Sequence, residues 1–222
     1  MPISTRDLSA LPDPHPLEKL TQSIALLEAI ISPVWEYRYF SYNRLWDETK
    51  GERMASMRNG SGDEYFLVFS PLGAFLKGFD HESPMSPWAQ EPSAVWPGVL
   101  DHVPAKFAPF LPEPAFSAEN TTFCIWKAAT DPTWQRGPVS FPDGDDPDGS
   151  ENLLWMLDGN PETYAQFATE HYEETLNLDQ IRKIYEWTPL HSAIILELKP
   201  EADIGQALAD AAEIGYPVAN PL

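Results

Sequence analysis

Residues 34–88 read VWEYRYFSYNRLWDETKGERMASMRNGSGDEYFLVFSPLGAFLKGFDHESPMSPW, and this stretch decides the fold. Apolar side chains recur at every second position in much of it, and this spacing places one face of a pleated strand on a core. Turn residues interrupt the pattern at 59–63 (NGSGD) and at 70–73 (SPLG). The pattern therefore predicts an antiparallel meander with strands at 34–41, 52–58, 64–70 and 74–79.

A fifth strand is predicted after a proline-rich segment. Eight prolines fall between residues 83 and 114, and this density prevents long helices or strands. The same segment carries aromatic side chains, so we expect an irregular layer packed on the sheet and not a loose linker. Residues 120–128 are again rich in apolar side chains and are expected to join the sheet, which would be mostly antiparallel.

Helices are predicted towards both ends of the chain. Residues 16–31 place leucine and isoleucine side chains on one stripe after an initial proline. In the carboxyl-terminal third, Asn160 and Asn177 are favourable helix caps, and 204–214 is followed by a glycine suited to a helix C-terminus. The segment 189–199 is ambiguous, because its Thr-Pro start favours a helix whereas the apolar run within it is also compatible with a strand.

Together these elements predict an α+β fold. The sheet would be covered by the amino-terminal helix and by a helical carboxyl-terminal third. We expect one domain over residues 1–222, since the aromatic residues of the proline-rich segment and the strand at 120–128 connect the two halves of the chain. Residues 1–14 are polar and rich in proline, and are expected to form a surface tail.

Composition excludes several classes of protein. Hydrophobic residues make up 43% of the chain, which is too many for a disordered protein. No segment approaches the roughly 18–20 uncharged apolar residues that cross a bilayer, and the amino terminus lacks the apolar run of a signal peptide. Cys124 is the only cysteine, so an intrachain disulfide is impossible. We expect a soluble, cytoplasmic protein.

The formal net charge is −20, and most of it lies in the second half of the chain. Residues 140–222 alone carry seventeen acidic and three basic side chains. Such a surface repels phosphate backbones, so nucleic-acid binding is not expected. Two interpretations remain open: the charge keeps the protein soluble, or it attracts a basic protein partner.

The candidate ligand-binding residues lie where the last strand of the meander ends. They are Asp80, His81, Glu82, Ser83 and Trp88, in a loop stiffened by prolines. Loops held by a rigid sheet are frequent binding sites, and an adjacent histidine and glutamate are able to transfer protons or to share a metal ion with another carboxylate. The alternative is structural, because aspartate and serine are also ordinary turn residues.

No other motif points to a catalytic or cofactor site. The aspartate-rich run 143–148 does not place its carboxylates at the spacing of an EF-hand, so a solvated turn is expected there and an occasional bound cation is left open. The remaining histidines have no metal-binding spacing, and the sequence lacks phosphate-binding and nucleophile-elbow motifs. We therefore predict no cofactor and no dedicated metal site.

Residues 56–88, SMRNGSGDEYFLVFSPLGAFLKGFDHESPMSPW, resemble a family of bacterial proteins to which no function is assigned. The later stretch LLWMLDGNPETYAQFATEHYE, residues 153–173, fits the same pattern. The resemblance implies a bacterial cytoplasmic protein and supplies no catalytic residue. Acidic α+β proteins of this size are also similar in general character to the immunity proteins of bacterial toxin systems, which is an analogy of fold class and charge.

Two functional hypotheses follow. In the first, a non-enzymatic protein binds a basic protein partner through its acidic surface, as an immunity protein would. In the second, the loop at 80–88 is the site of an enzyme or of a protein that binds a small ligand or metal. The sequence leaves the oligomeric state undetermined.

Overall fold

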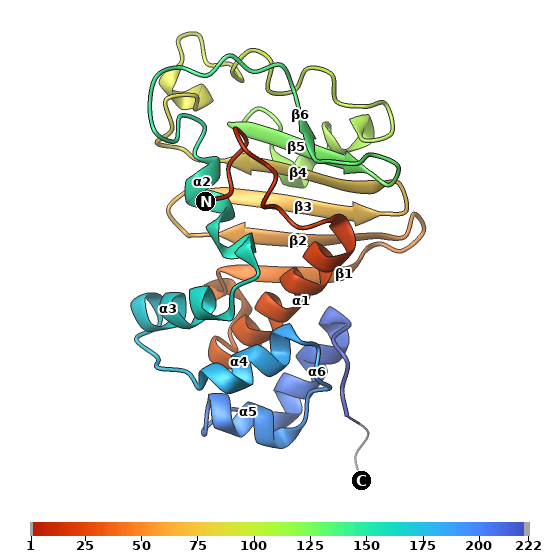
Figure 1. Cartoon of the computed structure of the whole chain (residues 1–222), viewed down its shortest axis with the longest axis vertical. Coiled ribbons are helices and arrows are strands. Elements are labelled where there is room, and N and C mark those ends of the chain that lie inside the picture. The colour runs from red at the N-terminus through yellow and green to blue at the C-terminus, as the bar shows by residue number, and fades with distance from the viewer. Residues whose placement is uncertain (1, 220–222) are drawn as a thin grey trace.

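The computed structural model describes residues 2–219 and contains one antiparallel sheet with six strands in sequence order (Figure 1). Every neighbouring pair of strands is also consecutive in the chain, so the sheet is a simple meander, and the predicted α+β fold is confirmed. The strands are β1 (Phe40–Asp47), β2 (Glu52–Arg58), β3 (Glu64–Ser70), β4 (Gly73–Phe79), β5 (Phe123–Ala128) and β6 (Gln135–Arg136).

The strand predicted at 34–41 is misplaced. A 3₁₀ helix occupies Trp35–Tyr37, and pairing with β2 starts only at Phe40, opposite Met57. The cause is Arg38, whose guanidinium donates hydrogen bonds to the carbonyl groups of Ser32 and Pro33 and so keeps the chain curled after the first helix. Trp35 and Tyr37 in this segment are exposed, whereas Tyr39 is half-buried against the core.

The amino-terminal helix and one short later helix lie over one face of the sheet, whereas the helices of the carboxyl-terminal third, which we expected to cover it, lie beyond its β1 edge (Figure 1). The longest, α1 (Pro14–Ile31), packs against β1 and has a buried stripe of leucine and isoleucine side chains, as expected. The others are α2 (Ser150–Leu154), α3 (Pro161–His171), α4 (Leu178–Tyr185), α5 (Ser192–Leu198) and α6 (Ile204–Ile214), with a 3₁₀ turn at Trp155–Asp158 after α2. The ambiguous segment 189–199 thus contains a helix.

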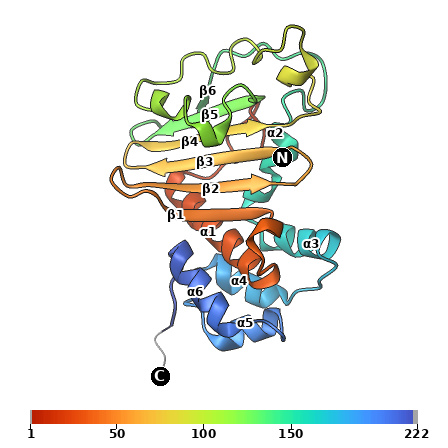
Figure 2. The same cartoon turned by 180° about the vertical axis from the view of Figure 1, so that it is seen from behind.

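The opposite face of the sheet carries a second hydrophobic cluster. It is formed between the strands and the irregular proline-rich layer predicted from the sequence. Phe66 and Phe75 point from the strands into this layer, where the rings of Phe107, Phe110 and Phe116 meet them. Short 3₁₀ helices at Pro87–Ala89, Ala108–Phe110 and Pro114–Phe116 are its only helical turns within residues 83–119. Figure 2 shows the layer from behind, at the β5 and β6 end of the sheet.

Residues 2–14, which belong to the predicted surface tail, are partly buried. Ile3 and Leu11 are buried in the helical core. Thr5 is also buried, because its backbone N–H donates to Ser150 Oγ at 3.0 Å and its hydroxyl donates to Asp148. Hydrogen bonding to the turn before α2 therefore fixes a segment whose composition alone indicated a free tail.

A buried carboxylate connects α1 to the rest of the fold. Glu28 is fully buried, and its two oxygens accept hydrogen bonds from four donors. The donors are the backbone N–H of Tyr39 (2.7 Å), that of Phe40 (3.3 Å), and the hydroxyl groups of Tyr164 (2.9 Å) and Tyr172 (2.8 Å). Glu28 therefore joins α1 to the start of β1 and to α3. Burial raises the pKa of Glu28, although the four hydrogen bonds oppose this.

None of the helices within residues 2–219 is both long enough and apolar enough to cross a bilayer.

We predict that Glu28→Gln changes the pH dependence of stability. The stabilising effect of a carboxyl whose pKa is raised by folding is complete below its ordinary pKa of 4.5 and is lost as the pH rises through the raised value. Glutamine does not titrate. The unfolding free energy of wild type minus that of Glu28→Gln should therefore decrease as the pH rises through this window. Urea unfolding at a series of pH values measures it.

The control is Glu36→Gln, at an exposed position in the 3₁₀ helix before β1. The difference in unfolding free energy between wild type and Glu36→Gln should stay constant over the same pH range. Glu28→Ala, which leaves four donors without an acceptor, should cost at least about 3 kcal/mol. Parallel pH curves for wild type and Glu28→Gln would show that Glu28 does not titrate differently in the two states.

Candidate functional site

The loop predicted as a site begins directly after β4 and is held in place by the turn before α2. Asp80 Oδ1 accepts a hydrogen bond from the backbone N–H of Glu82 (3.0 Å), and Oδ2 accepts one from Asn152 Nδ2 (3.1 Å). Gly149 lies so close that a Cβ at this position would come within 2.2 Å of the Asp80 Cβ. A glycine is required here, since its φ of 73° is also in the left-handed region.

His81 pairs with a residue that the sequence did not single out, Asp63. His81 Nδ1 lies 2.6 Å from Asp63 Oδ1, which also accepts the His81 backbone N–H at 2.9 Å. This hydrogen bond raises the pKa of His81. Burial raises the pKa of Asp63, but hydrogen bonds from His81 and Asn59 outweigh that effect and lower it. The two groups thus form a charge-assisted pair, with His81 Nε2 turned away from Asp63.

The other predicted site residues do not converge on this pair. The Glu82 side chain is 86% exposed, and its carboxylate is 3.9 Å from His81 Nε2. Ser83 is buried and donates to the backbone oxygen of Pro147 at 2.7 Å, which is a structural role. Trp88 is exposed, rests edge-on against Phe79 and lies 6.1 Å from the His81 ring, measured between ring centroids.

Three side chains of this loop region are placed to act together. Asp63, Asp80 and His81 each offer a ligand atom, and these atoms lie within 4.8 Å of one another. Burial raises the pKa of Asp80, and the nearby Asp63 charge adds to this effect. Two carboxylates and one imidazole suit a divalent cation, and a carboxylate-oriented imidazole also suits proton transfer.

A small pocket lies beside this cluster and was not predicted from the sequence. It has a volume of about 270 Å³. It is called the aromatic pocket below, and it is lined by Tyr39, Phe40, Met57, Asn59, Asn152, Leu153, Trp155, Phe167, Glu170 and His171. Asn59 and Asn152 belong to both places, because their amide groups donate to Asp63 and Asp80 respectively. His81 itself does not line the pocket.

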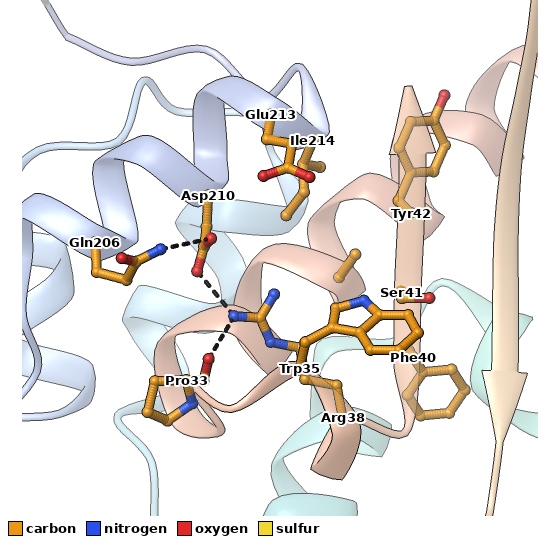
Figure 3. A pocket seen from close by; sticks show the side chains of 11 residues that line it. Pro33, Trp35, Arg38, Phe40, Ser41, Tyr42, Gln206, Asp210, Glu213 and Ile214 are labelled. Carbon is orange, nitrogen blue, oxygen red and sulfur yellow. Dashed lines mark hydrogen bonds and ion pairs between the residues drawn. The ribbon is translucent and has the colours of Figure 1, made fainter. Parts of the chain in front are cut away.

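A polar pocket of about 280 Å³ lies between the start of β1 and α6, and Figure 3 shows its lining. Arg38 Nη2 donates to Asp210 Oδ2 at 2.8 Å, and Gln206 Nε2 donates to Asp210 Oδ1 at 3.0 Å. The side chains of Arg38 and Asp210 are each only 10% exposed. The guanidinium also donates to two backbone carbonyl groups. It therefore connects α6 with the chain before β1, which is a structural role.

Comparisons with protein-family models, with curated proteins and with solved structures found no match to this chain.

We predict that Asp63→Asn lowers the pKa of His81 relative to wild type, because the hydrogen bond from a carboxylate is the main cause of the raised value. The stabilisation from this pair is complete between the ordinary aspartate pKa of 3.8 and the ordinary histidine pKa of 6.5. It is lost as the pH rises through the raised pKa of His81 or falls through the lowered pKa of Asp63. NMR titration of the imidazole resonances measures the shift directly.

Asp145→Asn is the matched control, since it removes an exposed carboxylate from the turn at 143–148. It should leave the titration curve of His81 as in wild type. A His81 curve that is the same in wild type and Asp63→Asn would contradict the pairing.

Proposed function

We propose that this chain is a non-enzymatic bacterial cytoplasmic protein that binds a basic protein partner through its helical lobe, comparable in role to an immunity protein. The helical lobe comprises α3 to α6, residues 161–214. The observation that carries the proposal is the concentration of negative charge in this lobe, which has eleven acidic and three basic side chains. Figures 1 and 2 place the lobe beyond the β1 edge of the sheet, at the opposite end from β6.

The basic side chains of the lobe offset only part of this charge. Arg182 forms ion pairs with Glu162 and Asp179. Lys199 Nζ lies 3.5 Å from a carboxylate oxygen of Glu174 and 3.9 Å from one of Glu201. In the described part of the chain, six carboxylates of the lobe form no ion pair: Glu170, Glu173, Glu186, Glu197, Asp203 and Glu213. The lobe therefore presents unneutralised negative charge to an approaching protein.

Charge of one sign on one end of a molecule has a defined physical effect. It raises the association rate of a partner with the opposite charge and repels nucleic acid, and both effects weaken as salt shortens the screening length. The proposal therefore requires binding that depends on ionic strength and on the position of the carboxylates, and not merely on the net charge of the protein.

We predict that reversing charge on the lobe abolishes partner capture. Wild-type protein and the triple variant Glu173→Lys, Glu186→Lys, Glu213→Lys are immobilised and exposed to a lysate of the host cells. A basic protein should be retained by wild type, lost from the lobe variant, and released from wild type between 0.1 and 1 M salt, over which the screening length falls from about 10 to about 3 Å.

The matched control carries the same change in net charge away from the lobe, as Glu91→Lys, Asp143→Lys, Asp145→Lys, all at exposed positions. It should retain the same basic protein as wild type. Equal retention by all three proteins, or retention that survives 1 M salt, would contradict the proposal. Circular dichroism verifies that each variant is folded.

The second candidate is a metal-dependent or small-ligand site in the loop at 80–88, favoured by the convergence of Asp63, Asp80 and His81 within 4.8 Å. On this hypothesis, titration with Zn²⁺ or Mn²⁺ in a calorimeter should show one binding event. His81→Ala should weaken binding at least about tenfold, as loss of groups at metal sites commonly does, whereas Asp145→Asn should not. Identical isotherms for wild type and His81→Ala would exclude the site.

A further inference from the structure

The aromatic pocket is formed where α3 meets the start of β1. The Tyr39 ring lies 5.2 Å from the Phe167 ring and 4.7 Å from the His171 ring, between centroids, with its edge towards both. The Phe167 and His171 rings are stacked at 5.1 Å with an interplanar angle of 9°. The Trp155 ring lies 5.8 Å from that of Phe167, on the 3₁₀ turn after α2. Four aromatic groups therefore surround one small space.

The one acidic or basic side chain that lines this pocket, apart from a histidine, is a carboxylate. Glu170 on α3 is exposed and contributes the one charged side chain of the lining, which contains no lysine or arginine. Behind the lining amides of Asn59 and Asn152 lie the carboxylates of Asp63 and Asp80, and each accepts a hydrogen bond from one of these amides. A cation in the pocket would thus have one carboxylate at its side and two more beyond the amides.

The imidazole of His171 does not cancel this potential. It contacts the rings of Tyr39, Phe167 and Tyr172 although the residue is exposed, and partial burial of the ring lowers its pKa. Of the charged groups on the neighbouring elements, Glu170 is negative, and the guanidinium of Arg58 at the end of β2 lies over the Trp35 and Phe66 rings, which do not line the pocket. At neutral pH the pocket therefore presents uncharged aromatic rings together with the Glu170 carboxylate.

This chemistry matches an organic cation. Aromatic faces attract a guanidinium or ammonium group, and an adjacent carboxylate adds Coulomb attraction. The Glu170 carboxylate would repel an anion, and a neutral apolar group would gain nothing from its charge. The volume of about 270 Å³ lies just below the roughly 300–1,000 Å³ typical of pockets for drug-sized ligands, which favours the end of a side chain over a large molecule.

We propose that the aromatic pocket binds an arginine side chain of the basic partner. This inference rests on the proposed function and deepens it, because it assigns a specific anchor within an otherwise diffuse acidic surface. The Arg guanidinium stacks on aromatic rings and forms paired hydrogen bonds with a carboxylate, which suits it better to this site than a lysine ammonium. Arginine is enriched among the few residues that carry most of the binding energy of a protein interface.

The experiment uses the full chain and a defined probe, the capped tripeptide glycyl-arginyl-glycine amide. Its neutral control is the same peptide with citrulline, which has a similar shape and no charge. NMR titration should show saturable shifts at Tyr39, Phe167 and His171 with the arginine peptide. The citrulline peptide should bind at least about tenfold more weakly, because it lacks the cation–π and Coulomb contributions.

Two variants locate the binding. Glu170→Gln and Trp155→Ala should each weaken binding of the arginine peptide about three- to tenfold. Glu173→Gln is the matched control, because Glu173 is also exposed, lies three residues after Glu170 and does not line the pocket. Equal binding of the arginine and citrulline peptides, or equal effects of Glu170→Gln and Glu173→Gln, would overturn the proposal.

A third probe distinguishes the source of the cation. Agmatine carries a guanidinium group on a free small molecule, and binding of agmatine without binding of the tripeptide would overturn a partner side chain as the occupant. The two proposals also fail separately. Partner capture that depends on the lobe but is unaffected by Trp155→Ala contradicts the pocket alone. Peptide binding at the pocket, with partner capture insensitive to the lobe reversal, contradicts the proposed function alone.

Discussion

The structure depends on the buried carboxylate of Glu28. Its oxygens are the meeting point of three elements, because they accept hydrogen bonds from the backbone at the start of β1 and from tyrosine hydroxyls on and just after α3. Taking a carboxylate out of water is costly, and only an arrangement that supplies several donors at once compensates for it. The position of α3 relative to the sheet is therefore specified by polar contacts as well as by apolar packing.

That junction also forms the aromatic pocket. Tyr39 donates its backbone N–H to Glu28 while its ring forms one wall, and Phe167 lies on α3 one turn beyond Tyr164, which binds the same carboxylate. The hydrogen bonds that fix α3 thus also fix the distance between the facing rings. A pocket held by buried contacts is preorganised, so a ligand does not have to order its walls on binding.

Local patterns predicted β2 and β3 at their observed limits and β4 within one residue, because each is a hairpin strand with alternating or continuous apolar residues and a turn signal. The strand at 34–41 failed because alternation there coincides with a curl imposed by Arg38, whose partner Asp210 is far away in the sequence. Asp63 was within reach of sequence reasoning: the β3–β4 register pairs Glu64 with Phe79, and extending it by one step sets Asp63 opposite Asp80.

The aromatic pocket was beyond such reasoning, since its lining comes from β1, β2, the turn after β2, α2 and α3, and no periodicity in one segment reports on the others. The same is true of the link between the two candidate sites. Asn59 and Asn152 line the pocket, and each donates an amide hydrogen bond to one carboxylate of the loop cluster. Among the described residues, His81 is the basic side chain that pairs with Asp63. The cluster has two carboxyl groups and one imidazole, so its acidic groups outnumber its basic ones. A positive group entering the pocket would therefore be attracted by charge that the fold itself leaves uncompensated.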